Sequence, residues 1–237
     1  MSLLFRLSLG MFAAAVLAAC SSVPTSGGGP AADAPTYHVG DRWVYQLQDG
    51  FFRTVMHWEE THEVTSITAD GITVRVTAKG DITGERTELW AAPGVVKVGT
   101  LVDIEIRRFT PVPLKEYDFP LAPGKVWNQR INQINETTKH EGEINRYVRV
   151  GGWQQTTTPA GSFDTLQMQI SMWLDDETFW RYPTNCTYQS FYAPTTRSMV
   201  HEEKECQYIE KGLDNSGFPI RTQHALVDLV SFTPGKP

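Results

Sequence analysis

Strict alternation of apolar and polar residues is the feature that most limits the fold of this 237-residue chain. The pattern has a period of two over 72–79 and again over 102–107, and its longest run covers 166–174. Apolar positions of that run are Leu166, Met168, Ile170, Met172 and Leu174, set against the polar Gln167, Gln169 and Ser171. Successive side chains of a strand point to opposite faces, so each run predicts a strand with one buried face.

Turn signals separate these runs, among them Asp70-Gly71, Pro93-Gly94, Pro123-Gly124 and Pro159-Ala160-Gly161. Their regular spacing predicts an all-β fold, an antiparallel meander of about ten or more strands. A sandwich, a barrel and an open half-barrel all satisfy this pattern, and we expect a sandwich or an open half-barrel.

Two short motifs recur in the same order and indicate two similar halves, 36–120 and 121–237. Gly40-Asp41-Arg42-Trp43 and Gly124-Lys125-Val126-Trp127 share a Gly-x-x-Trp opening. Later in each half, Leu89-Trp90-Ala91-Ala92-Pro93 is similar to Phe191-Tyr192-Ala193-Pro194. Chance recurrence of Gly, Trp and Pro at strand boundaries is the alternative.

The N-terminus has one basic residue, Arg6, followed by an apolar run of about thirteen residues that is typical of an export signal. A membrane-spanning helix needs roughly 20 residues, so this run is too short to span a bilayer. Leu17-Ala18-Ala19-Cys20 resembles the lipobox of bacterial lipoproteins. The resemblance implies that residues 1–19 are a signal peptide and that Cys20 carries acyl chains. An ordinary secretory signal with a coincidental cysteine is the alternative.

Residues 20–35 comprise the cysteine that the resemblance implies is acylated and a segment rich in Ser, Gly, Pro and Ala, whose composition predicts a flexible tether with nothing to bury. The β-rich domain then covers 36–237. Ser21 and Ser22 after the cysteine are similar to the outer-membrane pattern of such lipoproteins. We therefore expect lipid anchoring at the periplasmic face of the outer membrane.

Cys186 and Cys206 are the two cysteines left once Cys20 is lipidated. Exported proteins fold in an oxidising compartment, where an even pair usually forms a disulfide. A hairpin folded about Thr196 would set the two cysteines opposite each other. The sequence therefore predicts a disulfide, with two free thiols or a metal pair as the alternatives.

The Gly-x-x-Trp openings, Pro159-Ala160-Gly161-Ser162-Phe163 and the aromatic-Ala-Pro turn also resemble uncharacterised β-rich proteins of the bacterial envelope. Half-barrel carriers of lipids and lipoproteins are a more distant architectural analogy, and analogy of fold does not establish function.

No constellation of catalytic or metal-ligating residues stands out. A net charge of -6 without a basic block argues against nucleic acid as a partner. His57 and His62 are an odd number of residues apart, so they should point to opposite faces of a strand, and we expect the histidines to face solvent. Glu202-Glu203 is expected to be solvated charge. We expect no cofactor, no metal and no enzymatic activity.

The tryptophans divide into two groups. Trp43, Trp90 and Trp127 stand beside Gly and Pro turns and are predicted to anchor the core. Trp173 shares a face with Gln167 and Gln169, away from the Met/Leu/Ile face, and marks a predicted contact surface.

The leading functional hypothesis is a lipid-anchored envelope lipoprotein whose non-enzymatic β-domain binds or supports a periplasmic partner. A carrier or sensor of a hydrophobic ligand, such as a lipid or a lipoprotein acyl chain, is the second hypothesis, and a hydrolase is the third. An apolar cavity lined by Trp and Met would favour the carrier. A flat surface with Trp173 would favour the partner, and His, Ser and carboxylates converging in a cleft would favour the hydrolase.

Overall fold

The computed structural model describes residues 28–51, 54–101, 104–175, 181–211 and 220–236. This part of the chain forms thirteen strands in one sheet and contains no helix. In chain order the strands are β1 (Arg42–Phe51), β2 (Thr54–Thr68), β3 (Gly71–Gly80), β4 (Gly84–Ala92), β5 (Val95–Gly99), β6 (Arg107–Thr110), β7 (Leu114–Lys115), β8 (Val126–Asn135), β9 (Glu141–Thr158), β10 (Gly161–Asp175), β11 (Thr184–Ala193), β12 (Ser198–Ile209) and β13 (Ile220–Thr233). Among the described residues there is consequently no helix of the length and apolarity needed to cross a membrane.

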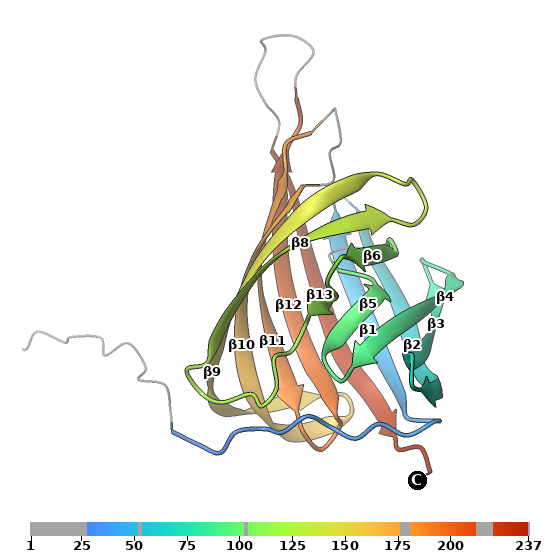
Figure 1. Cartoon of the computed structure of the whole chain (residues 1–237), viewed down its shortest axis with the longest axis vertical. Helices are drawn as coiled ribbons and strands as arrows, with labels where there is room; N and C mark the ends of the chain where they lie inside the picture. The colour runs from blue at the N-terminus through green and yellow to red at the C-terminus, as the bar shows by residue number, and fades with distance from the viewer. Residues whose placement is uncertain (1–27, 52–53, 102–103, 176–180, 212–219, 237) are drawn as a thin grey trace, which may run out of the picture.

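The strands pair antiparallel into a closed ring (Figure 1). β1 pairs with β13, and β4 pairs with β5, so the pairings run all the way round. β7 pairs only with β5 and stands outside the ring, which leaves twelve strands in it. Neighbours in an antiparallel ring alternate in direction, so only an even number of strands can close it. The predicted all-β antiparallel meander is confirmed, and of the three arrangements that the sequence allows, the pairings form a barrel.

The ring is flattened because the short strands β5 to β7 lie against the concave face of the long ones (Figure 1). Val96, Phe109 and Leu114, which come from these short strands, belong to the same buried cluster as Met168 and Tyr192 from β10 and β11. Burial of their apolar surface therefore holds one wall of the barrel against the other.

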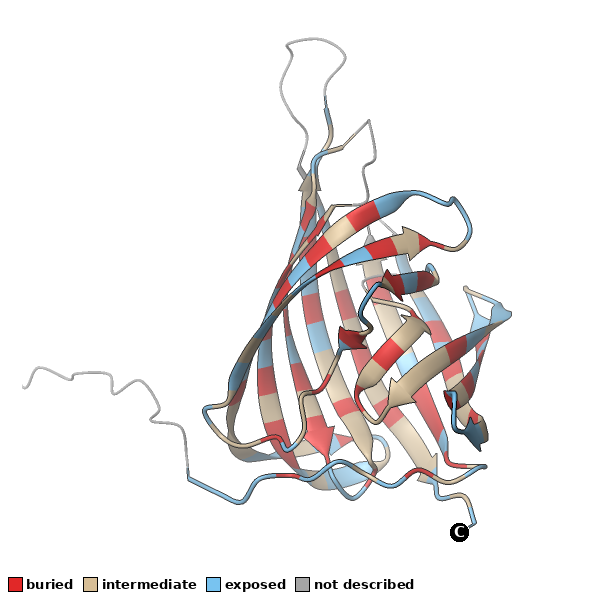
Figure 2. Ribbon diagram, viewed as in Figure 1, coloured by how far each residue is buried: buried red, intermediate tan, exposed pale blue. Residues whose placement is uncertain are grey.

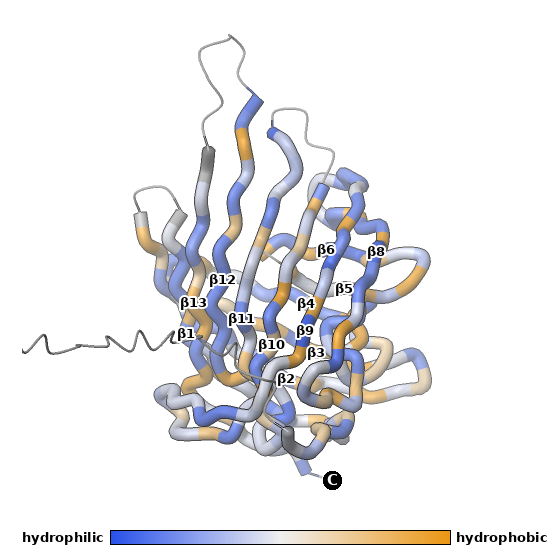
Figure 3. Tube along the Cα trace, turned by 90° about the vertical axis from the view of Figure 1, so that its left-hand side faces the viewer, coloured by the Kyte–Doolittle hydropathy of each residue, from blue (hydrophilic) through white to orange (hydrophobic). Residues whose placement is uncertain are grey.

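Alternation along β10 sets its inner and outer faces as predicted. Met168, Ile170 and Met172 are 0%, 3% and 4% exposed, whereas Gln169 is exposed. Figure 2 shows the same alternation of buried and exposed residues along the neighbouring strands, and Figure 3 shows it as alternating hydropathy. The inward assignment of the Met/Ile face is confirmed.

The two Gly-x-x-Trp openings have the same local geometry. Gly40 donates its N–H to the carbonyl of Val64 at 2.8 Å, and Gly124 donates to the carbonyl of Val150 at 2.9 Å. Both glycines have positive φ, 89° and 84°, a conformation that glycine adopts without strain. Both segments belong to one continuous ring, and the division into halves at 36–120 and 121–237 stays a prediction.

The segment before β1 is docked on the barrel, which corrects part of the expected tether. Ala32 is 5% exposed, and its N–H and C=O each pair with Leu121 at 2.8 Å. The carbonyl of Pro30 accepts a hydrogen bond from Trp153 Nε1 at 2.9 Å. Figure 1 shows the segment crossing the base of the barrel. Paired backbone and a buried alanine offset the chain entropy that would otherwise keep it free. Cys20 and residues 1–19 lie outside the described residues.

Candidate ligand-binding cavity

A partly open cavity of about 190 Å³ lies inside the barrel, between its long and short strands. A cavity of about 150 Å³ can hold benzene, so this space is large enough for a small organic molecule. Aromatic side chains that line it include Trp43, Tyr45, Trp58, Trp90, Tyr117 and Tyr188. Acidic and basic side chains share the wall, namely Asp49, Glu60, His62, Arg86, Glu88, Glu116, Arg146, Glu202 and Lys204.

One charged cluster is centred on Glu60 of β2. Arg86 of β4 donates from Nη1 and Nη2 to the two carboxylate oxygens of Glu60, each at 2.8 Å. His62 Nε2 lies 3.0 Å from Glu60 Oε2, and Trp58 Nε1 donates to Oε1 at 3.1 Å. Burial alone would raise the pKa of Glu60, but the hydrogen bonds from His62 and Arg86 outweigh it and hold the pKa well below its usual value. Glu60 is therefore a satisfied anion.

Glu88 extends this cluster along β4. Its Oε1 accepts a long hydrogen bond of 3.4 Å from Arg86 Nε, and its Oε2 accepts one of 3.2 Å from Trp90 Nε1. Thr100 Oγ1 lies 3.5 Å from Oε1. Glu88 thus shares a guanidinium whose two terminal nitrogens are already directed at Glu60.

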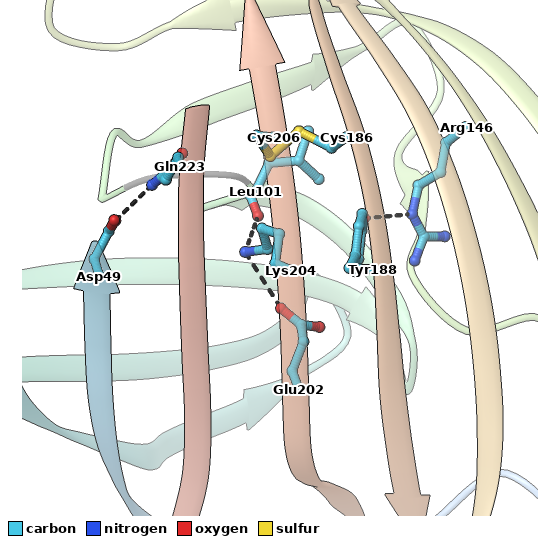
Figure 4. The surroundings of a disulfide bond; sticks show 9 residues. All are labelled: Asp49, Leu101, Arg146, Cys186, Tyr188, Glu202, Lys204, Cys206 and Gln223. Atoms are coloured by element: carbon cyan, nitrogen blue, oxygen red, sulfur yellow. Dashed lines mark hydrogen bonds and ion pairs between the residues drawn. A yellow bond between two sulfur atoms is a disulfide. The ribbon is translucent and has the colours of Figure 1, made fainter. Parts of the chain in front are cut away.

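The second cluster lies on β11 and β12, across the cavity (Figure 4). Lys204 Nζ is 3.2 Å from Glu202 Oε1 and donates to the carbonyl of Leu101 at 3.2 Å. The same ammonium lies 5.6 Å from the ring centroid of Tyr188, within cation–π range. Three separate contacts therefore occupy this lysine.

Arg146 of β9 is 2% exposed and enclosed by the wall. It donates to Tyr188 Oη at 3.2 Å and to the backbone carbonyls of Lys115 and Glu116 at 3.1 and 3.3 Å. Burial lowers the pKa of Arg146, but Tyr188 and Glu116 outweigh that effect and raise it, so the guanidinium stays charged. Figure 4 shows Arg146 and Tyr188 pointing toward each other from adjacent parts of the sheet.

Glu116 differs from the other carboxylates of the wall. Within the described part of the chain, its carboxyl group makes no hydrogen bond or ion pair, although it lines the cavity. Burial raises the pKa of Glu116 to about 7, and nearby Arg146 offsets this only in part, while Glu202 and Glu88 raise the pKa further. A carboxyl group without a partner among the described residues thus faces the cavity.

The disulfide stands on the inner face beside the second cluster (Figure 4). Cys186 of β11 and Cys206 of β12 are bonded, with Cα atoms 4.1 Å apart, and both are buried. The turn pairs Ala193 with Ser198, and a bulge at Val200 then shifts the register by one residue. Without that extra residue the cysteines would not lie opposite each other. The predicted disulfide is confirmed.

The histidine and acidic expectations need correction. His57 and His62 do lie on opposite faces of β2. His62 faces the cavity rather than solvent because it is an even number of residues from Trp58 and Glu60, which line the cavity. Glu202 likewise lies inside, paired with a buried lysine, whereas Glu203 is exposed as expected. Throughout the described ranges, no three His, Cys, Asp or Glu residues are grouped so that they could hold a metal ion.

The predicted contact surface lies on the other side of the sheet from the cavity. Gln169 is exposed and Trp173 half-buried on the outer face of β10, and Gln167 Nε2 donates to Gln189 Oε1 at 2.6 Å. Their role in contacting a partner stays a prediction.

The tryptophans predicted to anchor the core do pack against it. Trp43 is 1% exposed, and Trp90 and Trp127 are partly buried against the core clusters. Trp43 and Trp90 also line the cavity, so these two residues belong both to the core and to the site.

Charged residues that lie an even number of positions from buried residues of the same strand are the sequence signal for charges inside the barrel. Glu60 and His62 are in phase with the buried Trp58 and Val64 of β2, and Arg86 and Glu88 are in phase with Trp90 of β4. Ionisable residues on the apolar side of an alternating strand are therefore the pattern by which a sequence can indicate a polar cavity.

No family model matches this sequence, and no curated protein matches it significantly. Among solved structures, one similar to it is a protein from Bacteroides fragilis, provisionally described as exported and as having a YmcC-like fold. The two share 13% identity at a TM-score of 0.53, over 85% of this chain and 99% of that one. A protein from Parabacteroides distasonis, provisionally described as a lipoprotein, matches at 10% identity and a TM-score of 0.46, over 86% of this chain and 100% of that one. The chain therefore shares the fold of the Bacteroides fragilis protein.

Proposed function

We propose that this protein is a lipid-anchored envelope lipoprotein whose β-domain binds a small molecule inside the barrel without converting it. The observation that carries the proposal is the Glu116 carboxyl group, which lines this cavity without a hydrogen-bond or ion-pair partner among the described residues. Glu116 is half-buried and its pKa is raised, so its charged form costs stability, and a ligand that supplies a compensating contact would explain why it lies there.

The proposed location rests on the signal peptide, residues 1–19, and on Cys20. Cys20 lies twelve positions before Ala32, which is fixed to Leu121 at the base of the barrel. A fully extended chain covers at most about 3.5 Å per residue, so the base would lie within about 40 Å of an acyl anchor on Cys20. The Bacteroides fragilis protein of similar fold is described as exported, which agrees with a location in the cell envelope. Ser21 and Ser22 favour the outer membrane.

The wall of the cavity favours a small polar ligand over an acyl chain. A hydrophobic carrier would need a continuous apolar lining, whereas nine acidic or basic side chains line this space. A hydrolase would need a nucleophile within hydrogen-bond reach of a general base. The Ser198 hydroxyl pairs with Tyr45 Oη at 2.9 Å and His62 Nε2 lies 3.0 Å from Glu60 Oε2, so the described residues do not form a serine–histidine pair here. A partner bound through the outer face at Trp173 is a separate proposal that the cavity neither needs nor opposes.

Native mass spectrometry of the full-length protein, purified from envelopes in mild detergent, tests this function. Ala225→Phe would fill the cavity from β13, and Thr187→Phe, which places the same ring on the outer face, is the matched control. A bound small molecule should accompany the wild type and Thr187→Phe but not Ala225→Phe. A wild type without ligand, or a ligand retained by the filled variant, would contradict the proposal.

A further inference from the structure

We propose that the ligand of this cavity is a small organic cation, such as a quaternary or primary amine, held between the Glu116 carboxylate and the aromatic rings of the wall. This inference rests on the proposed function and names the chemistry of its ligand.

Charge balance is the first argument. The lining acids are Asp49, Glu60, Glu88, Glu116 and Glu202, and the lining bases are Arg86, Arg146 and Lys204. Five acids against three bases leave a formal excess of two negative charges with His62 neutral. A cleft with low-dielectric walls and an excess of one charge concentrates the electric field, so the cavity attracts a cation and repels an anion.

Occupancy of the basic groups is the second argument. Arg86 is engaged in two hydrogen bonds with Glu60, and Lys204 contacts Glu202 and a backbone carbonyl. Arg146 donates to a tyrosine hydroxyl and two backbone carbonyls. An anionic ligand would have to displace these contacts. A cation needs to displace nothing at Glu116, whose carboxyl group has no partner in the described part of the chain.

The aromatic wall is the third argument. Tyr37 packs against Trp43 and Trp90 with ring centroids 5.7 and 5.5 Å apart, and all three line the cavity. The indole N–H of Trp90 is directed at Glu88 Oε2, so the edge of that ring is already occupied by a carboxylate. Faces of tyrosine and tryptophan rings attract ammonium groups, most strongly where water is excluded.

Size and donor geometry narrow the ligand class. A cavity of about 190 Å³ holds a molecule only slightly larger than benzene, which fits a trimethylammonium compound and excludes a long polyamine. The described carboxylates and histidines are not grouped for a metal ion. The cation is therefore expected to be organic.

A set of three matched probes tests the charge of the ligand. They are choline, its neutral isostere dimethylbutanol in which carbon replaces nitrogen, and the anion dimethylbutanoate. Binding to the full-length protein in a nonionic detergent would be measured by calorimetry and by tryptophan fluorescence. Choline should bind at least about tenfold more tightly than the neutral isostere, a ratio that cation–π contacts alone can supply in a dry site, and the anion should not bind.

Substitution of Glu116 tests the site. At pH 8, Glu116→Gln should weaken choline about tenfold and leave dimethylbutanol unchanged, because only the charge is removed. Glu59→Gln, which alters an exposed carboxylate of β2, is the matched control and should bind choline as the wild type does.

The pH dependence supplies an independent readout. Glu116 faces Arg146 of β9, Glu202 of β12, Glu88 of β4 and His62 of β2, and its pKa is raised to about 7 by burial. Choline keeps its charge at every pH, and protonated Glu116 should bind it about as weakly as glutamine does. The affinity should therefore fall about sevenfold between pH 8 and pH 5.5 as Glu116 takes up a proton. Glu116→Gln should abolish this sevenfold fall of choline affinity with pH.

The outcomes separate the inference from the proposed function. Equal or tighter binding of dimethylbutanol or dimethylbutanoate would overturn the cation and leave the cavity as a ligand site. Unchanged choline affinity in Glu116→Gln would overturn the role of that carboxylate. Failure of all three probes to bind would overturn the organic cation, and the proposed function would then depend on whether native mass spectrometry finds a small molecule in the wild type but not in Ala225→Phe.

Discussion

Replacing Glu116 with glutamine should stabilise the protein at high pH and have little effect at low pH. Burial holds the pKa of Glu116 at about 7, against an ordinary value of 4.5. The unfolded chain therefore loses its proton near pH 4.5, whereas the folded chain keeps it until about pH 7. Between these values the folded state binds more protons than the unfolded state, so stability falls as pH rises.

The size of the effect follows from the two pKa values. One pKa unit corresponds to about 1.4 kcal/mol, so a complete separation of 2.5 units sets an upper limit of about 3.4 kcal/mol. The resulting loss of stability is less than about 1 kcal/mol at pH 5 and close to the upper limit at pH 8. Because the Glu116 side chain is only half-buried, solvent screens part of the effect, and we expect about 2 kcal/mol of difference between the two pH values.

Urea denaturation at pH 5, 6, 7 and 8, without reductant, measures how the unfolding free energy depends on pH. The difference in unfolding free energy between Glu116→Gln and the wild type should grow in favour of the variant as pH rises. Glu59→Gln should follow the wild type at every pH, because Glu59 is exposed. A variant that is less stable at pH 8, or a difference independent of pH, would refute a protonated carboxyl group in the cavity.

Three further predictions concern the core, the disulfide and the anchor. Ile170→Ala should lower the unfolding free energy by about 2–5 kcal/mol because Ile170 is 3% exposed, whereas Gln169→Ala on the outer face should change it by less than about 0.5 kcal/mol in urea denaturation. Replacing Cys186 and Cys206 with alanine should cost about 3 kcal/mol for a separation of 20 residues, and thiol counting on denatured, unreduced wild type should find neither thiol reactive. Cys20→Ala should release the protein from membranes or leave an uncleaved precursor, and unchanged membrane association in fractionated cells would contradict lipidation.

The inner faces of β3 and β10 were predictable because one face of each strand is buried and the side-chain period is two, whereas the alternation at 102–107 forms no strand over residues 104–106. The run at 166–174 contains no Gly or Pro, and its alternation fixed which side of β10 faces inward. The disulfide was predictable for a different reason, since a hairpin with its centre at Thr196 pairs positions whose numbers add to a constant. That pairing holds only because the bulge at Val200 compensates for the four-residue turn. Local sequence did not indicate the bulge.

Closure of the barrel was not predictable from the alternation. Pairing of β1 with β13 and of β4 with β5 joins segments whose contact depends on sheet twist and strand number, and no short motif encodes either. The cavity depends on that closure. Glu88 of β4 and Glu116 after β7 approach each other only because the short strands fold against the concave face of the sheet. Residue parity could have indicated that Glu60, His62 and Glu88 point inward, although the sequence prediction did not use it, and it could not have shown which inner charge would lack a partner.

The stability and the binding experiments measure one interaction from two sides. Replacing a carboxyl group that serves only the fold lowers stability, because its hydrogen bonds are lost with it. Glu60 is of that kind, since four hydrogen bonds from three side chains surround it, and Glu60→Gln should destabilise the barrel. Glu116→Gln should have the opposite effect, making the protein more stable and less able to bind choline. A single substitution that raises stability and lowers affinity would identify a residue kept for its ligand, because folding alone would favour the glutamine.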